Sequence, residues 1–207
     1  NLPSCKAFTL FFPQKKLTYG IFNFFFKTHN LMKRILKINL LGILLFTAIN
    51  SFAQADTSKP QSPPAMVTKK VGATTITIKY SQPSIRGRQI GINLEPMEGQ
   101  VWRAGANEAT VFEVNKDVVV EGQPLPKGKY GFFILVNGEA WTMIFNKTWK
   151  QWGAFKYNEK KDVLRVSVMD KEVESFSEKL TYSIGDDGTV SILWGNRHIN
   201  FLVQEKQ

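Results

Sequence analysis

The segment VWRAGANEAT, residues 101–110, gathers side chains that are able to bind a polar molecule. Arg103 supplies five hydrogen-bond donors, Asn107 supplies donors and acceptors, and Glu108 supplies acceptors when it is ionised. The small residues between them let another group approach the backbone closely. Two interpretations stay open. These side chains form the polar half of a ligand pocket, or they form an internal network that holds a loop, with Trp102 as its hydrophobic plug.

Two arginines in the segment SIRGRQIG form a second candidate site, because Arg86 and Arg88 are two residues apart. In an extended segment they would point the same way and bind one carboxylate or phosphate together. In the alternative, which we favour, they bind backbone carbonyl groups or pair with an acidic neighbour such as Glu95.

Aromatic residues are concentrated in TWKQWGAFKY, residues 148–157, which holds Trp149, Trp152, Phe155 and Tyr157. Exposed aromatic faces hold sugar rings in many binding proteins, while Asn, Arg and Glu bind the hydroxyl groups. We expect Trp152 and Tyr157 to form such a stacking wall. Aromatic side chains also simply close the end of a β-sandwich, and this alternative stays open.

Glu108 is the candidate residue for catalysis, as a general acid or base with Arg103 stabilising a developing anion. A glycosidase needs two carboxyl groups roughly 5 to 9.5 Å apart, and Glu95 and Glu98 are the candidate partners. No HExxH, GxSxG, P-loop or GxGxxG motif occurs from residue 54 onward. Binding without catalysis is therefore favoured over an enzyme.

Metal and cofactor sites are not expected from residue 54 onward. This part has no cysteine and one histidine, His198, so one chain is unable to form a His- or Cys-rich zinc site. We expect His198 on a strand rather than in a catalytic triad. Asp186 and Asp187 offer oxygen ligands for calcium, but Asp-Asp-Gly before a strand is typical of a turn.

The elements that position these residues are predicted to be β-strands. Alternation of apolar and polar residues predicts strands over residues 74–80, 110–114, 118–122, 163–169 and 176–184. Short strands with frequent turns are typical of a single antiparallel β-sandwich, with a closed barrel as the alternative. Two long irregular loops interrupt the pattern, at residues 81–105 and 146–162.

Two hairpins are predicted from their turn residues. Asn137-Gly138 is a strong signal for a two-residue type I′ turn, which would pair Ile134 with Trp141. Gly195-Asn196 would form a second turn, which would pair Ile192 with Ile199.

The N-terminal part is interpreted as processing sequence rather than fold. Residues 32–53 have the basic start, short apolar run and small −3 and −1 residues of a secretory signal peptide. Residues 1–31 are interpreted as a non-native extension upstream of Met32. Residues 54–65 are polar and proline-rich, and we expect them to be a disordered linker. The sandwich domain is predicted over residues 66–205.

Removal of residues 1–53 changes the charge. They hold seven of the 27 basic residues and none of the 17 acidic ones, so the mature chain carries about +3 rather than +10. This value argues against a nucleic-acid partner. The removed part also contains the single cysteine, Cys5, so no lipid-anchoring cysteine remains. We expect an exported, periplasmic protein without a membrane span after cleavage, and not a lipoprotein.

Four segments in order, RGR (86–88), VWRAGANEAT (101–110), LPKGKYGFF (125–133) and QWGAFKY (151–157), resemble an exported bacterial family catalogued as domain of unknown function 2911. The resemblance implies an exported, β-rich single domain and no established activity. Its motif positions correspond to Trp102, Arg103, Gly105, Asn107, Glu108, Thr110, Gln151, Trp152 and Gly153.

The sequence therefore predicts a periplasmic binding module for a carbohydrate or another polar small molecule. The alternatives are a hydrolase that uses Glu108, and a structural domain that contacts other proteins along a sheet edge. Nothing in the sequence indicates an oligomeric state. The predicted binding residues are Arg86, Arg88, Trp102, Arg103, Asn107, Glu108, Trp152 and Tyr157.

Overall fold

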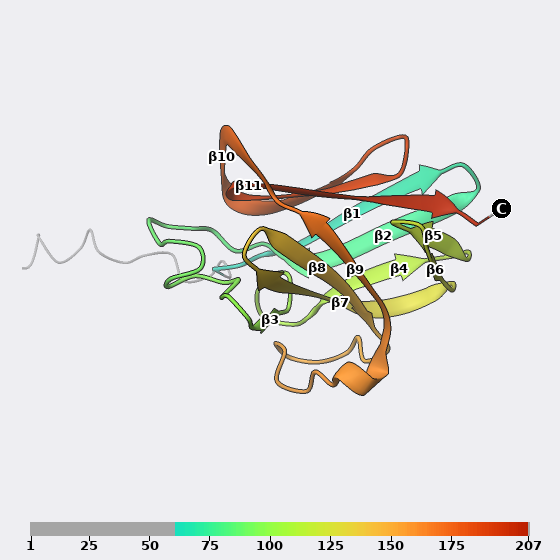
Figure 1. The fold of residues 1–207 in the computed structure, drawn as a ribbon, viewed down its shortest axis with the longest axis horizontal. Coiled ribbons are helices and arrows are strands. Elements are labelled where there is room, and N and C mark those ends of the chain that lie inside the picture. The colour runs from blue at the N-terminus through green and yellow to red at the C-terminus, as the bar shows by residue number, and fades with distance from the viewer. Residues whose placement is uncertain (1–60, 207) are drawn as a thin grey trace, which may run out of the picture. The chain divides into compact units, whose positions relative to one another are not determined.

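The computed structural model describes residues 61–206, which form two antiparallel β-sheets packed face to face (Figure 1). The predicted all-β sandwich is confirmed, and the sheets do not close into a barrel. Within the described residues the only helical segment is a 3-10 turn, Glu159–Lys161. The predicted extension 1–31, the signal peptide 32–53 and most of the linker 54–65 lie outside the described residues.

The larger sheet has the strand order β1-β2-β4-β7-β8-β9, with β3 paired to β7. Its strands are β1 (Pro64–Val71), β2 (Thr74–Ser81), β3 (Val101–Trp102), β4 (Thr110–Val114), β7 (Gly128–Asn137), β8 (Ala140–Asn146) and β9 (Asp162–Met169). The smaller sheet, β10-β11-β5-β6, contains β5 (Val118–Val120), β6 (Gln123–Leu125), β10 (Lys171–Ile184) and β11 (Thr189–Glu205). Because β1 begins at Pro64, residues 64–65 of the predicted linker belong to a strand.

Period-two alternation explains how the sheets form one core. In β2, Ile76, Ile78 and Tyr80 are buried, and the residues between them face outward. Phe112 of β4 lies on the same inner face and packs with Phe201 of β11 in the opposite sheet. The outer face of the larger sheet carries polar and half-buried side chains, except where a second, smaller buried cluster forms from Ala109, Phe133 and Ile144.

The hairpin predicted at residues 137–138 forms, but its register was predicted wrongly. The turn begins at Gly138, and Ile134 pairs with Met143 rather than with Trp141. A type I′ turn centred on residues 137–138 needs positive φ at both, and of these two only Gly138 adopts it, at 60°. The resulting shift of two residues leaves every side chain on its predicted face.

The hairpin predicted at Gly195-Asn196 is wrong. The chain continues through this point as one 17-residue strand, β11, so Ile192 does not pair with Ile199. Gly195 has a φ of 62°, and it pairs with Ser177 of β10 where the register of the two strands shifts. The glycine therefore serves a β-bulge rather than a turn.

Both predicted irregular loops are present, and we call residues 82–100 the first loop and residues 147–161 the second loop. The first loop is tied to both sheets: Ile85 N–H donates to Glu178 O (2.9 Å), and Gly99 N–H donates to a carbonyl group of β7 (2.9 Å). The second loop, orange in Figure 1, extends below β7. The candidate site lies where the second loop meets the larger sheet.

Candidate functional site

The turn formed by residues 103–109 connects β3 to β4 and contains two left-handed residues, Ala104 (φ 53°) and Asn107 (φ 58°). Trp102, just before the turn, is only 1% exposed, and its indole N–H donates to Gly105 O (3.2 Å). The Trp102 ring therefore plugs the sandwich core and has no face available to a ligand.

Two buried hydroxyl groups hold the turn from inside. Thr110 Oγ1 (2.8 Å) and Tyr182 OH (2.7 Å) both donate to the carbonyl oxygen of Ala104. Burial raises the pKa of Tyr182 well above its ordinary value, so its hydroxyl stays protonated and donates. A Cβ on Gly105 would lie 2.9 Å from Thr110 Oγ1 and 3.1 Å from Ser81 O. The space that Gly105 leaves open is therefore occupied by atoms of β2 and β4, and not by a ligand.

The same turn is joined to the second loop by backbone hydrogen bonds. Gly153 N–H donates to Asn107 O (2.9 Å), and Ala109 N–H donates to Gln151 O (3.0 Å). Glu108 lies between these bonds with an exposed side chain. The turn and the second loop therefore lie side by side. Both were predicted from the sequence to contain binding residues.

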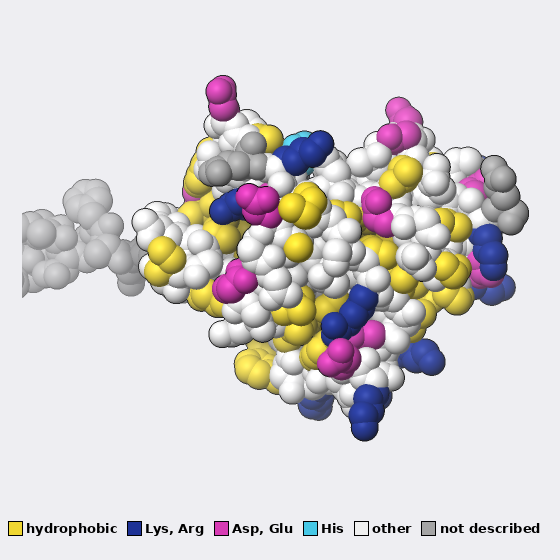
Figure 2. Space-filling model, in the orientation of Figure 1, with side chains coloured by type: hydrophobic (Ala, Val, Ile, Leu, Met, Phe, Trp, Pro, Cys, Tyr) yellow, Lys and Arg dark blue, Asp and Glu magenta, His cyan; other side chains and the backbone are white. Residues whose placement is uncertain are grey.

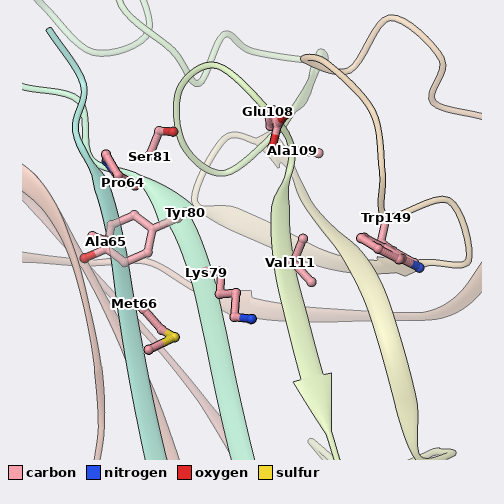
Figure 3. A pocket seen from close by; sticks show the side chains of 10 residues that line it. All are labelled: Pro64, Ala65, Met66, Lys79, Tyr80, Ser81, Glu108, Ala109, Val111 and Trp149. Carbon is pink, nitrogen blue, oxygen red and sulfur yellow. The ribbon is translucent and has the colours of Figure 1, made fainter. Parts of the chain in front are cut away.

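A groove of about 450 Å³ opens beside this junction, on the outer face of the larger sheet (Figure 3). Met66 of β1, Lys79 of β2 and Val111 of β4 are direct cross-strand neighbours and form its floor. Figure 3 shows Glu108 where β4 begins and Trp149 on the opposite side of β4 from Lys79. The complete lining is Pro64, Ala65, Met66, Lys79, Tyr80, Ser81, Glu108, Ala109, Val111 and Trp149.

Gly131 of β7 explains how the Trp149 wall is positioned. It is the next cross-strand neighbour of Val111, and its missing side chain leaves room for the second loop. A Cβ there would lie 2.6 Å from Thr148 O and 3.3 Å from the Cα atom of Trp149. A glycine inside a strand often marks such a close approach of two backbones.

The Trp149 ring is fixed but accessible. Its side chain is 39% exposed, and the Lys129 ammonium group lies 5.0 Å from the ring centroid, in cation–π range. Lys129 is itself paired with Glu113 (3.3 Å). The groove thus combines a held aromatic surface with two exposed charges, Lys79 and Glu108, neither of which forms an ion pair with another described residue.

Arg103 lies elsewhere, in a smaller cavity of about 200 Å³ between the first loop and the core. Arg88, Glu95 and Trp194 line the same cavity. Burial lowers the pKa of Arg103, and the nearby Glu95 carboxylate opposes this effect. The Nε atom of Arg103 is buried and has no acceptor among residues 61–206.

The two arginines of the first loop do not form a shared fork. Arg88 donates to the carbonyl oxygens of Ser84 (2.6 Å) and Ile85 (3.0 Å), which is the interpretation that the sequence favoured. Arg86 is exposed, and its backbone N–H donates to the Glu178 carboxylate (2.8 Å).

The remaining predicted binding residues lie outside the groove lining. The Asn107 amide donates to Ser62 O (3.2 Å), and Trp152 is 62% exposed. The Tyr157 hydroxyl donates to Asp162 Oδ2 (2.6 Å) and accepts from Arg165 Nη2 (2.6 Å). Burial and the bond to Asp162 raise the pKa of Tyr157 to about 12, while Arg165 opposes this rise. Tyr157 therefore anchors the second loop.

Sequence reasoning missed the groove residues Met66, Lys79 and Val111, and passed over Trp149 in favour of Trp152. A signal for Lys79 was present, because alternation in TTITIKY puts it on the outer face once Ile76 is placed in the core. Which residues lie beside Lys79 depends on the order of the strands in the sheet. Alternation of apolar and polar residues does not predict that order, so the groove was missed.

The expected turn at GDDGT is formed by hydrogen bonds within the chain. Asp187 accepts from Thr189 N–H (2.9 Å) and Thr189 Oγ1 (2.7 Å), which lowers the pKa of Asp187. Asp186 pairs with Lys69 (2.5 Å). Among residues 61–206, no three His, Cys, Asp or Glu side chains are grouped as metal ligands would be. In the same range, no helix has the length and hydropathy needed to cross a membrane.

Comparison with known proteins gives one family match. The sequence profile of a family described as "Protein of unknown function (DUF2911)" matches residues 62–203. No curated protein and no solved structure matches the chain. The match spans nearly the whole described domain, including both loops and every residue of the groove.

Proposed function

This chain belongs to the DUF2911 family of proteins of unknown function, and we propose that its domain is a binding module for a carbohydrate or another polar small molecule. The ligand occupies the groove on the outer face of the larger sheet. Sugars are the favoured class, because a ring with apolar C–H faces and polar hydroxyl groups matches an aromatic wall beside a carboxylate and an ammonium group.

One observation carries this proposal: the groove holds Trp149, Glu108 and Lys79 around a volume of about 450 Å³. Small-molecule sites commonly have volumes of about 300 to 1,000 Å³, mostly apolar walls and a few placed polar groups. Trp149 is held at its backbone by the Gly131 contact and at its ring by Lys129, which lies over one face, so little side-chain freedom is lost on binding.

Export to the periplasm is part of the proposal and is supported by the signal-peptide pattern of residues 32–53. A binding module in that compartment meets glycans and small polar molecules directly. The proposed binding form is therefore the chain from residue 54 onward.

Binding is favoured over hydrolysis because Glu108 is the only carboxylate among the groove-lining residues. Glu95 lines the smaller cavity, and the Glu98 carboxylate accepts a hydrogen bond from Gly138 N–H (2.8 Å). Neither candidate partner faces Glu108 across the groove, whereas glycoside hydrolysis needs two carboxyl groups on either side of one bond.

The test is a thermal-shift screen of residues 54–207 against monosaccharides, oligosaccharides and glycan fragments. A ligand at a hundredfold excess over its Kd stabilises the folded state by about 2.7 kcal/mol, which gives a clear rise in Tm. We expect Trp149→Ala and Glu108→Gln each to abolish the shift produced by a hit.

Trp152→Ala is the matched control, because this tryptophan is exposed on the same loop but outside the groove. It should retain the full shift. A shift that survives both groove variants but disappears in Trp152→Ala would move the ligand to the loop surface and refute the groove.

A further inference from the structure

The second loop is held rigidly although it has almost no regular secondary structure. Its ends are joined by the Lys147 N–H bond to Lys161 O (2.9 Å), and Gln151 bridges it internally by donating to Thr148 O (2.9 Å) and accepting from Lys156 N–H (3.2 Å). Bonds from the neighbouring strands and the 103–109 turn add to these. The side chains at its surface are therefore displayed in fixed positions.

Two large aromatic side chains of this rigid loop point into solvent. Trp152 is 62% exposed and Phe155 is 86% exposed. The Phe155 ring lies over Gly153, where a Cβ would be 3.0 Å from two ring carbons. Exposed apolar surface that is rimmed by polar residues commonly marks a site of interaction with a protein or a membrane.

The loop is also strongly basic. Its five lysines are Lys147, Lys150, Lys156, Lys160 and Lys161. All five are exposed, and none forms an ion pair with another described residue. Its single acidic residue, Glu159, is paired with Arg165 of β9 (3.4 Å). Figure 2 shows hydrophobic and dark-blue basic side chains together at the lower end of the molecule, where Figure 1 places this loop.

We propose that this basic tip, formed by Trp152, Phe155 and the five lysines, docks on the surface of an anionic lipid bilayer. The two aromatic rings enter the headgroup region, as tryptophan side chains do in membrane-interface belts. The lysines contact lipid phosphate groups, each contributing through the negative surface potential. The loop is too short to span a bilayer, so the docking is peripheral and reversible.

The charge favours a lipid surface over a protein partner. Protein interfaces are depleted of lysine and enriched in arginine, whereas lysine is a hydrated point charge suited to a fluid array of phosphates. All the unpaired charges of this tip are lysines. This inference does not depend on a ligand in the groove, because Trp152, Phe155 and the five lysines are not among the groove-lining residues.

The test is co-sedimentation of residues 54–207 with lipid vesicles. We expect binding to vesicles of phosphatidylcholine with roughly 30% phosphatidylglycerol, little binding to phosphatidylcholine alone, and loss of binding at high salt. Trp152→Ala combined with Phe155→Ala should weaken binding by about ten-fold or more, since each ring buries apolar surface. Lys147→Gln with Lys150→Gln and Lys156→Gln should also weaken it, and only on the anionic vesicles.

Phe176→Ala is the control, because Phe176 is similarly exposed (59%) but lies on β10 of the smaller sheet. It should bind like the wild type. The proposal is overturned if the wild type fails to bind anionic vesicles at low salt, or if the aromatic and lysine variants bind as well as Phe176→Ala. The proposal is also overturned if, without vesicles, the wild type captures a protein that the Trp152→Ala/Phe155→Ala variant no longer captures, because the tip would then bind a protein partner.

Discussion

Tyr157 is the side chain that ties the second loop to the edge strand β9. Its hydroxyl lies between the Asp162 carboxylate and the Arg165 guanidinium group, 2.6 Å from each. Its ring packs edge-on against Phe133, with centroids 5.2 Å apart. One phenol thus links the loop's polar network to the apolar cluster beneath it.

Tyr157→Phe should make the free energy of unfolding less dependent on pH in the alkaline range. The folded-state pKa is raised to about 12 from an unfolded value of 10.0, so the contribution of the hydroxyl is complete below pH 10 and is lost as the pH rises through 12. Below pH 10 the wild type should be more stable than the variant by about 1 kcal/mol, the typical worth of a hydrogen bond. Urea unfolding of both proteins between pH 8 and about 12 measures the difference. A difference that stays constant over this range would contradict the assignment.

The second loop and β7 fit together because position 131 has no side chain. The loop carbonyl approaches the strand backbone so closely that Thr148 O would be only 2.6 Å from a Cβ at position 131. This contact sets the position of Trp149 and, through the 103–109 turn, that of Glu108. The groove is therefore a product of how two elements pack.

Gly131→Ala should loosen the loop without unfolding the protein. The added methyl group overpacks the contact, which typically costs about 1 to 3 kcal/mol. The amide protons of Ala109 and Gly153, which bond the turn to the loop, should then exchange with solvent about ten-fold faster or more. NMR-detected hydrogen exchange measures this directly.

Gly138→Ala is the matched control for that prediction. Position 138 has a φ of 60° but no atom within 4 Å of an added Cβ, so the substitution strains only the β7–β8 turn. Unchanged exchange at Ala109 in Gly131→Ala, or equal acceleration in Gly138→Ala, would show that the contact does not hold the loop.

Strands were predictable wherever alternation was strong, and less so where pairing depends on distant residues. Residues 110–114 were predicted to the residue as β4, since one face alternates cleanly. The bulge at Gly195 looked like a turn, because Gly-Asn favours positive φ in both settings and only the partner strand distinguishes them. For the site, the sequence did not distinguish Trp149 from Trp152 as the groove wall. The contact that distinguishes them joins Trp149 to Gly131, which is 18 positions away.

Across the whole domain, phenylalanine rings from both sheets form one cluster. Phe201 of β11 lies 5.7 Å from Phe132 of β7 and 6.3 Å from both Phe112 of β4 and Phe145 of β8, between ring centroids. All four are buried in the same core. The two sheets are therefore coupled and should unfold as one cooperative unit.

Phe201→Ala should lower the free energy of unfolding by about 3 to 5 kcal/mol, the usual cost of emptying a core phenylalanine site. Circular dichroism during urea unfolding should show a single transition at a lower midpoint. Phe176→Ala removes the same ring from an exposed site and should change stability by less than about 0.5 kcal/mol. Two separate transitions in Phe201→Ala would mean that the sheets are stable independently.

The burial of the tryptophans gives the protein its own optical labels. Trp102, Trp141 and Trp194 lie in the core, whereas Trp149 forms the groove wall and Trp152 lies on the basic tip. Core indoles emit at shorter wavelengths and are shielded from aqueous quenchers such as acrylamide. The quenchable emission of the folded protein therefore comes from Trp149 and Trp152. Replacing either one with phenylalanine leaves a single spectroscopic probe on the other surface, so occupancy of the two surfaces can be followed separately without an added dye.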